Sequence, residues 1–468
     1  MMIQLSGKYN KYFRGIVNKN NSYLNTFIFL VVDAFAIFIC FQAAIWLREF
    51  IGFAFNKPID LSNLLQQSNA AIIFCLSVFI IFGFYPGYGL TAVRELEQTS
   101  KMVTLVFFLL TGISYLSKFY QDFSRFVLIV AWLLTLVILP LMHFFIRNVL
   151  SRTSFYGTPV VIYGNPPLAE AIEYSLLNSR RLGWIPHRIF PLSAATSDKL
   201  IANYENIAIL ATEEQEVVKS YTRALSRNYR KVVLIQQNDH FGTHWITPHD
   251  LGGLLGLEFE YHLLDPVAVF VKRVIDIIFG IFLFVLASPL LLIFAIWIKL
   301  DSPGPVLFRQ ERLGYLQKPI TFLKLRTMIQ NAPELLEQKL AENPELKGEY
   351  DKYHKLKNDP RITHAGRFLR RFSLDELPQL INVINGEMSL SGPRPYLVNE
   401  LDEMGNSAQI ILRVKPGITG WWQVMGRNTA TFQQRLEMDE YYISNWSVWM
   451  DAYLFMKTVA IIPKGKGY

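Results

Sequence analysis

The sequence predicts a membrane protein with three parts: an α-helical four-span bundle, a Rossmann-like α/β middle domain, and a mainly α C-terminal domain with a re-entrant membrane helix. Of its 468 residues, 51% are hydrophobic, and the mean hydropathy of +0.23 is high for a soluble protein. Long apolar runs fill the first 150 residues and recur at 269–300, while strand and helix patterns alternate between them. We place the three parts at residues 1–152, 153–265 and 266–468.

Charge and cysteine content narrow the class of protein further. The net charge of +8 suits an anionic membrane and a phosphate ligand, and the many Phe and Leu residues in long runs make nucleic acid the weaker partner. Cys40 and Cys75 both lie inside apolar runs, so we expect packing residues without a disulfide framework or a thiolate metal site. The first apolar run starts near Leu24, too late for a typical signal peptide, which indicates an anchor.

The N-terminal part contains four apolar segments, at residues 24–46, 70–84, 103–116 and 126–146. The middle two are shorter than the roughly 20 residues that a spanning helix needs, and a buried helical hairpin is the alternative for that pair. Basic residues precede the first segment, and Arg147 and Arg152 follow the fourth. The positive-inside rule therefore predicts that both flanks lie on the cytoplasmic side.

In the middle domain, apolar runs at 160–164, 207–210 and 231–235 read as buried strands, and 169–177 reads as a helix. This alternation predicts a parallel α/β layer. The first turn is Gly164-Asn165-Pro166-Pro167, which lacks the three glycines that allow a backbone to approach a pyrophosphate. We therefore expect no bound dinucleotide here, and a regulatory or dimerising role in a homodimer.

The apolar stretch at 269–300 is long enough to cross a bilayer as one helix. Lys272 and Arg273 lie at its start and Lys299 at its end, which favours both ends on one face of the membrane. Ser288 and Pro289 lie near the middle, where the proline removes a backbone hydrogen bond and bends the helix. These features predict a re-entrant helix; the alternative is a fifth, kinked span that would export the C-terminal domain.

Aromatic residues recur at helical spacing near the C-terminal end, at Tyr441, Tyr442, Trp446, Trp449 and Tyr453. Aromatics on one side of a helix are usually core residues. Next to a re-entrant helix, a second use is to hold the domain at headgroup depth on the membrane surface.

The most informative segment is Ser373-Leu374-Asp375-Glu376-Leu377-Pro378-Gln379. Proline is tolerated in the first turn of a helix, so Pro378 predicts a helix that begins near Asp375. Free N–H groups at that end would favour an ionised Asp375. Neighbouring residues point in different directions on a helix, so Asp375 and Glu376 are expected to do separate jobs. The competing interpretation is a capping box formed by Ser373 and Glu376, or Asp375 as an N-cap.

Cations surround this segment in Gly/Pro-rich sequence. Arginine binds phosphate oxygens bidentately and lysine adds a point charge, so the pattern favours a phosphate ligand. The candidate substrate-binding residues are Lys324, Arg326, Arg361, Arg370, Arg394 and Arg427.

These motifs together resemble the bacterial sugar transferase family, in the form of the long monotopic polyprenyl-phosphate phosphoglycosyl transferases that act on undecaprenyl phosphate with galactose or glucose. The resemblance covers about residues 269–468. It rests on Phe322-x-Lys324-x-Arg326-Thr327-Met328, Lys357 to Thr363, Ser373 to Gln379, Gly386 to Leu390, Gly392-Pro393-Arg394-Pro395, Lys415 to Gly420, Trp422-Gln423-Val424 and Gly426-Arg427.

The resemblance implies a reaction in which Asp375 attacks the β-phosphate of a UDP-hexose, expels UMP and holds the sugar phosphate for transfer to undecaprenyl phosphate. Glu376 would help to hold Mg²⁺. Ser288 and Pro289 match the helix-breaking pair of the family. The implied setting is the bacterial inner membrane, with a multi-pass chain, the catalytic domain on the cytoplasmic face, and a product that starts O-antigen, capsule or exopolysaccharide synthesis.

Two other functions fit the same residues less well. A membrane glycosyltransferase would move only the sugar and release UDP, and a non-catalytic scaffold would use the α/β domain as a nucleotide sensor. A glycosyltransferase would release UDP, whereas a phosphosugar transferase releases UMP. A scaffold would be unaffected by Asp375→Asn, whereas that substitution should abolish turnover in the enzyme.

Overall fold

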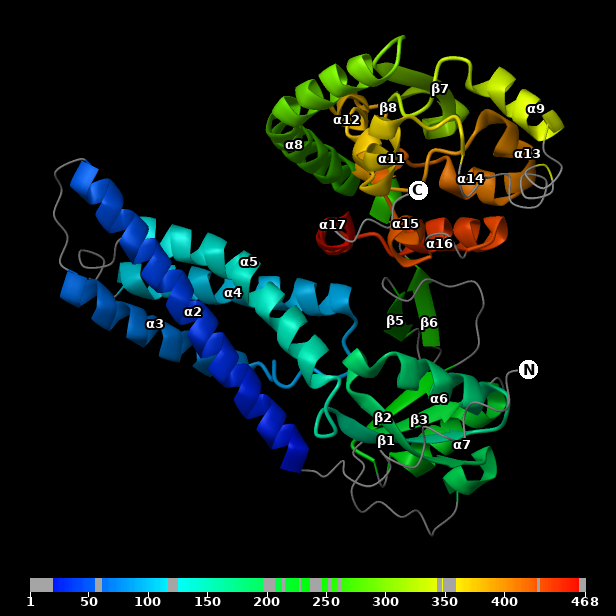
Figure 1. The fold of residues 1–468 in the computed structure, drawn as a ribbon. Coiled ribbons are helices and arrows are strands. Elements are labelled where there is room, and N and C mark those ends of the chain that lie inside the picture. The colour runs from blue at the N-terminus through cyan, green and yellow to red at the C-terminus, as the bar shows by residue number, and fades with distance from the viewer. Residues whose placement is uncertain are drawn as a thin grey trace. The chain divides into compact units, whose positions relative to one another are not determined.

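The computed structural model describes residues 20–54, 61–116, 125–196, 207–212, 215–226, 229–235, 246–250, 255–259, 262–342, 347, 359–426 and 430–462. The chain divides into two compact units, Met1–Asp239 and His240–Tyr468. Figure 1 shows their helices and strands.

The first unit begins with four helices, α2 (Asn20–Ala54), α3 (Leu61–Ile81), α4 (Ala92–Leu116) and α5 (Arg125–Leu150). They correspond to the four predicted apolar segments. Their shared core includes Phe41, Phe79 and Val106, and the free thiols Cys40 and Cys75 are buried in the same core. This agrees with the packing role expected for both cysteines.

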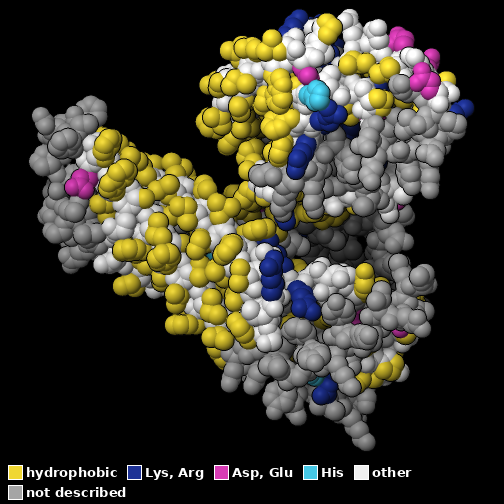
Figure 2. Space-filling view, viewed as in Figure 1, with side chains coloured by type: hydrophobic (Ala, Val, Ile, Leu, Met, Phe, Trp, Pro, Cys, Tyr) yellow, Lys and Arg dark blue, Asp and Glu magenta, His cyan; other side chains and the backbone are white. Residues whose placement is uncertain are grey.

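Two of these helices contain segments that are long and apolar enough to cross a membrane, Ser22–Gly52 and Arg125–Leu150. The apolar part of α3 is shorter, at Ser68–Ile81. Helix α4 starts with a polar turn that contains Arg94 and Glu95. A four-helix bundle is therefore present, whereas four membrane-spanning helices stay a prediction. Figure 2 shows hydrophobic side chains over the outer surface of these helices.

Ionisable side chains are buried inside this bundle. Asp33 accepts a 2.5 Å hydrogen bond from Tyr85 Oη, and its other carboxylate oxygen lies 2.7 Å from His143 Nε2. Glu95 lies between two guanidinium groups, 2.7 Å from Arg147 and 2.9 Å from Arg181. Arg181 belongs to the α/β domain, so Glu95 joins that domain to the bundle within the first unit.

The α/β domain contains a parallel sheet in the order β2-β1-β3-β4. The three predicted strands are present. A fourth strand, β2, lies at the edge of the sheet and was not predicted, because it contains Pro186 and polar residues. At the end of β1, a Cβ on Gly164 would lie 2.7 Å from that of Ala211, so close strand packing explains this glycine. The elements are β1 (Thr158–Gly164), α6 (Leu168–Asn178), β2 (Trp184–Phe190), β3 (Ile207–Ala211), α7 (Gln215–Leu225) and β4 (Lys231–Ile235).

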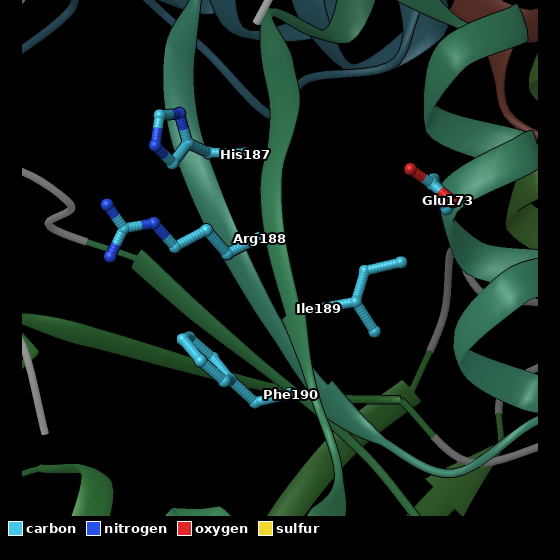
Figure 3. A pocket seen from close by; sticks show the side chains of 5 residues that line it. All are labelled: Glu173, His187, Arg188, Ile189 and Phe190. Atoms are coloured by element: carbon cyan, nitrogen blue, oxygen red, sulfur yellow. The ribbon is translucent and has the colours of Figure 1, made fainter. Parts of the chain in front are cut away.

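A pocket of about 310 Å³ opens between α6 and the edge strand β2 (Figure 3). Glu173 comes from α6, and His187, Arg188, Ile189 and Phe190 come from β2. The pocket has a single carboxylate among its lining residues. The acidic pair that the sequence predicts for catalysis, Asp375 and Glu376, belongs to the second unit.

The second unit opens with a short hairpin, β5 (Ile246–Asp250) and β6 (Leu255–Phe259), followed by the 36-residue helix α8 (Pro266–Asp301). Asp265 caps the start of α8 by accepting hydrogen bonds from the backbone N–H groups of Val267 and Ala268. The helix is the third one long and apolar enough to cross a membrane. Pro289 lies inside it, and α8 curves along one side of the unit in Figure 1.

Both ends of α8 are attached to the globular part of the same unit. Near the start, Arg273 donates hydrogen bonds to the carbonyls of Val383 and Ile384 at 2.6 and 2.8 Å. At the other end, Asp301 accepts a 2.8 Å hydrogen bond from the backbone N–H of Ala365. The helix therefore lies along the unit at both of its ends.

The globular part combines two small sheets with short helices. The antiparallel hairpin of β7 (Leu307–Leu313) and β8 (Pro319–Leu325) packs beside α11 (His364–Arg371), the 3₁₀ turn η6 (Leu374–Glu376) and α12 (Gln379–Asn385). The remaining elements are α9 (Ala332–Glu342), β9 (Ser389–Ser391), α13 (Leu401–Met404), α14 (Ser407–Ile411), β10 (Gly417–Thr419), α15 (Trp421–Met425), α16 (Phe432–Ser444) and α17 (Val448–Ile461).

The five aromatic residues do not share one helix as their spacing predicted, because α16 ends at Ser444 and α17 begins at Val448, with Trp446 between them. They belong mainly to the core. Tyr442, Trp446 and Tyr453 are all buried, and Tyr442 donates a 2.7 Å hydrogen bond to Asp451. The core interpretation of these aromatics is therefore confirmed, and their second use at headgroup depth does not fit three of the five residues.

Candidate active site

The acidic pair lies in a short irregular segment between α11 and α12. Ser373 adopts a left-handed conformation with φ of 55°, which is uncommon for a residue other than glycine. Its side chain makes no capping hydrogen bond. The capping-box interpretation is therefore wrong, and the strained turn presents Asp375 and Glu376 in η6 for another purpose.

The predicted helix starts later than the sequence suggested. Residues 374–376 form the 3₁₀ turn, and α12 begins only at Gln379, with Pro378 at its N-cap. Proline does mark the helix start, as predicted, but Asp375 precedes the helix by four residues. The N–H groups of α12 therefore do not set its ionisation.

Lys324 on β8 faces both carboxylates. Its Nζ donates a 2.8 Å hydrogen bond to Glu376 Oε1 and lies 3.7 Å from Asp375 Oδ2. The strand β8 places this lysine there because it runs beside η6. Lys324 thus interacts with both carboxyl groups, by a hydrogen bond to Glu376 and at longer range with Asp375.

The pKa values of the two carboxyl groups shift in opposite directions. Desolvation raises the pKa of Asp375 to about 6, the Glu376 charge adds to this effect, and Lys324 and Arg370 oppose it. For Glu376, the charge and hydrogen bond of Lys324 outweigh desolvation and lower the pKa, with further help from Arg394 and Arg312. The two acids therefore have separate roles, with Glu376 ionised throughout the neutral range and Asp375 ionised above about pH 6.

Three arginines complete the cationic side of the site. Arg370 donates a 2.9 Å hydrogen bond to Thr327 Oγ1 and acts electrostatically on Asp375. Arg394 stacks on the Trp422 ring, with 5.4 Å between the guanidinium carbon and the ring centroid. Arg312 comes from β7, next to β8. Together with Lys324, they give the site more positive than negative charge, which suits a diphosphate.

Sequence reasoning missed Arg312. Burial lowers its pKa to about 10, and the nearby charge of Arg394 adds to this effect. Its hydrogen bonds go to Gln310 and to the carbonyl of Pro395, with no ion pair to a described carboxylate. No signal in the sequence marked it, because Arg312 comes near Lys324 only through the pairing of β7 with β8.

A second buried acid supports the Arg394 loop. Asp439 on α16 accepts hydrogen bonds from Tyr396 Oη at 2.8 Å and from the backbone N–H of Arg394 at 3.3 Å. Desolvation raises its pKa to about 8, so it is largely protonated at neutral pH. This arrangement positions the loop that carries Arg394.

Two of the predicted substrate-binding residues are paired within the protein. Arg326 is buried and donates hydrogen bonds to the carbonyls of Pro303 and Ser302, so it holds the end of α8. Arg361 forms a bidentate pair with Asp359. Arg427 lies outside the described residues. Ser288 and Pro289 both lie in α8, where Ser288 Oγ donates to the carbonyl of Val285.

Among the described residues, no three His, Cys, Asp or Glu side chains gather into a metal site. Mg²⁺ commonly binds to one or two protein carboxylates and completes its shell with water and substrate phosphates. The pair Asp375 and Glu376 offers such a donor set, because Lys324 bonds to Oε1 of Glu376 and no described residue bonds to Oε2. The residues present therefore fit Mg²⁺ carried with a diphosphate.

The sequence was compared with known proteins. The family model "Bacterial sugar transferase" matches residues 267–465, which contain α8 and the whole acidic and cationic site. The chain is 31% identical over 387 residues to the undecaprenyl-phosphate galactose phosphotransferase of Salmonella typhimurium, a match that covers 78% of this chain and 80% of the relative.

Two further relatives match less than half of the chain. The exopolysaccharide production protein ExoY of Rhizobium meliloti is 38% identical over 208 residues, which are 44% of this chain and 92% of that protein. The UDP-glucose:undecaprenyl-phosphate glucose-1-phosphate transferase of Escherichia coli is 41% identical over 204 residues, which cover 42% of this chain and 41% of that protein. These two shorter matches have higher identity than the match over most of the chain.

Proposed function

Because this chain belongs to the bacterial sugar transferase family and is a transferase, we propose that it moves a hexose 1-phosphate from a UDP-sugar to undecaprenyl phosphate and releases UMP. The relatives named for galactose and glucose transfer to this lipid support the substrate class. The observation that carries the proposal is the buried Asp375, which faces Lys324 and Arg370 beside the separately ionised Glu376.

The reaction proceeds in two displacements. A carboxylate oxygen of Asp375 attacks the phosphorus next to the sugar, the bond to the bridging oxygen breaks, and UMP leaves with the electron pair. An oxygen of undecaprenyl phosphate then attacks the same phosphorus and frees the Asp375 carboxylate. Covalent catalysis of this kind divides one difficult transfer into two easier steps. The product is undecaprenyl diphosphate sugar, from which a surface polysaccharide such as O-antigen, capsule or exopolysaccharide is built.

The chain's own cations bind and orient the diphosphate. Lys324 holds Glu376 ionised, while Arg312 and Arg394, whose charges also act on Glu376, would neutralise the phosphate oxygens. Glu376 would hold Mg²⁺, which supplies further neutralisation of the diphosphate when bound.

We also propose that α8 is re-entrant and that the catalytic unit lies on the cytoplasmic face of the inner membrane. A straight helix of 36 residues would be about 54 Å long. Arg273 and Asp301, at opposite ends of α8, both bond to the same globular unit. One compact unit on one side of a bilayer satisfies both attachments, whereas a crossing helix would separate them.

For the α/β domain, a homodimer contact stays our proposal. Its sheet ends in the edge strand β2, and the turn after β1 lacks a dinucleotide fingerprint. The mass of the purified particle measured by light scattering tests this directly.

The experiment that tests the function is nucleotide release by the full chain in nanodiscs with undecaprenyl phosphate, Mg²⁺ and either UDP-galactose or UDP-glucose. We expect UMP from the native protein, none from Asp375→Asn, and unchanged release from the exposed control Asp402→Asn. Galactose is our first choice of sugar.

Release of UDP would instead establish a sugar-only transferase, and equal nucleotide binding without turnover in all three proteins would establish a sensor scaffold. Mass spectrometry of the quenched protein without acceptor lipid should show a hexose phosphate on Asp375.

A further inference from the structure

The outer face of α11 combines cations with a large aromatic side chain. His364, Arg367, Phe368 and Arg371 are all exposed, and their spacing of three, four and seven residues puts them on one side of the helix. Phe368 keeps 40% of its surface exposed. A single exposed apolar residue is common on protein surfaces, so the informative question is whether the apolar surface continues beyond Phe368.

The opposite face of α11 is fixed firmly, so this exposure is not the result of a loosely placed helix. Ala365 and Leu369 are fully buried against Phe294 and Ile298 of α8. A Cβ on Gly366 would lie 2.1 Å from the carbonyl oxygen of Thr327, so only glycine permits this close approach. The packing orients the outer face away from the core of the unit.

The aromatic surface continues from α11 onto α8. Phe368 lies 5.5 Å from Trp297 and 5.1 Å from Phe372, measured between ring centroids. Beyond Trp297, the apolar surface extends to Ile296 and Leu300, which are both exposed. Tryptophan concentrates where a membrane meets water. The edge of the candidate membrane helix is therefore continuous with the outer face of α11.

The charge of this surface has one sign. Lys299 at the end of α8 and Arg367 and Arg371 on α11 are exposed, and none forms an ion pair with a described carboxylate. Arg367 bonds to His364 Nδ1 at 2.7 Å, and Arg371 stacks on Phe372. Figure 2 shows basic side chains beside the hydrophobic side chains of α8.

We propose that this surface, made of Lys299, Trp297 and the outer face of α11, binds the headgroups of anionic phospholipids. Phe368 and Trp297 enter the interfacial layer, and the three cations meet the lipid phosphates. Basic side chains next to an apolar membrane-inserted surface are the usual combination for such binding. Because Asp375 follows α11 directly in the chain, the contact fixes the depth of the active site at the membrane surface. The proposal does not depend on which sugar is transferred.

A single label on α11 tests it in the full chain. Cys40 and Cys75 are buried, so a cysteine introduced by His364→Cys reacts selectively with a fluorophore. The labelled protein enters nanodiscs of phosphatidylcholine and phosphatidylglycerol without undecaprenyl phosphate. Quenching is compared when either the anionic or the zwitterionic lipid carries brominated acyl chains, which reports which lipid lies beside α11.

We expect stronger quenching by the brominated anionic lipid. Each basic side chain near an anionic surface strengthens the attraction about fivefold, so Arg367→Gln with Arg371→Gln should remove most of the preference. The matched control, Arg309→Gln with Arg413→Gln, replaces two exposed arginines elsewhere in the unit and should keep the preference. High salt should weaken the preference by screening.

Three outcomes would overturn the proposal. Equal quenching by both lipids would show that α11 meets the membrane without selecting anionic headgroups. Absence of quenching by either would show that this face meets water or protein. A preference that survives the double arginine substitution would place the selecting cations elsewhere. Since no acceptor lipid or UDP-sugar is present, these results are separate from the test of transfer.

Discussion

Lys324 donates its hydrogen bond to Glu376 at 2.8 Å and only approaches Asp375, at 3.7 Å. The lysine thus keeps Glu376 ionised and leaves the buried Asp375 with a pKa of about 6. A nucleophile gains from this arrangement, because a carboxylate bound tightly by a cation attacks less readily than one that is merely held near it.

The first prediction concerns the pH dependence of this pair. As the proposed nucleophile, Asp375 would have to be ionised to attack, so kcat/KM for the UDP-sugar should fall below about pH 6, roughly tenfold per pH unit. Lys324→Met removes the charge that lowers the pKa of both acids, so the acidic limb should move to higher pH. Its kcat/KM at neutral pH should fall by about 10²–10³. The control Lys324→Arg keeps the charge and should leave the limb in place; an identical profile in Lys324→Met would show that the lysine does not act on Asp375.

The second prediction concerns stability. Burial raises the folded-state pKa of Asp375 from 3.8 to about 6, so the fold disfavours its ionised form. The resulting cost is present above pH 6 and disappears as the pH falls through 6 toward 3.8. Asp375→Asn avoids this cost and should stabilise the second unit by about 2–3 kcal/mol at pH 7.5, and by less at pH 5. Thermal unfolding of the purified protein at the two pH values measures the difference. The exposed control Asp402→Asn should change little, and a destabilised Asp375→Asn would contradict the account.

The sequence predicted the acidic pair and its neighbourhood because these residues lie in long, specific motifs. It did not predict the ionisation of Asp375, because the argument placed this residue at a helix N-terminus. The structure instead puts it in η6, ahead of α12, where loss of water has the largest effect. Burial of one side chain depends on residues distant in sequence, which no local pattern reports.

Two arginines show the same limit of sequence-based prediction. Arg326 was predicted at the site but lies elsewhere, whereas Arg312 was not predicted but lies near the site. Alternation along a strand would put Arg326 on the same side as Lys324, but β8 ends at Leu325 and the guanidinium turns to the end of α8. Arg312 belongs to none of the sequence motifs described above, and it lies near the site only because β7 pairs with β8. The four N-terminal helices and three of the four sheet strands were predictable, since their apolar runs are continuous, whereas the edge strand β2 has a polar pattern.

The third prediction therefore tests Arg312. Arg312→Gln removes a guanidinium group that lies near that of Arg394 and forms no ion pair with a described carboxylate, so diphosphate binding should weaken. A lost charge-assisted hydrogen bond costs about 1.5–3 kcal/mol, which corresponds to a roughly ten- to hundredfold lower kcat/KM for the UDP-sugar. Arg309→Gln, an exposed arginine on the same strand, is the matched control. Equal kinetics in both variants would restrict Arg312 to a structural role.

The fourth prediction tests the buried ion network of the first unit. Glu95 is 4% exposed and faces Arg147 and Arg181, so Glu95→Gln leaves two guanidinium groups without their counter-charge. Removal of one partner from a buried pair costs about 3 kcal/mol or more, and thermal unfolding of the full chain should show a lower transition for this unit. Glu97→Gln, two residues further along, breaks only the surface pair with Lys101 and should cost less than about 1 kcal/mol.

Glu95→Gln should leave nucleotide release by the second unit unchanged at temperatures below that transition. The reason is that every residue we assign to the reaction lies within the matched residues 267–465, and a relative matched over 92% of its length aligns with only 44% of this chain. Parallel assays of unfolding and UMP release check both halves of the prediction. If UMP release fell while the unfolding temperature stayed the same, Glu95 would have to act on catalysis itself, and the first unit would then be part of the catalytic mechanism instead of an independently stabilised anchor.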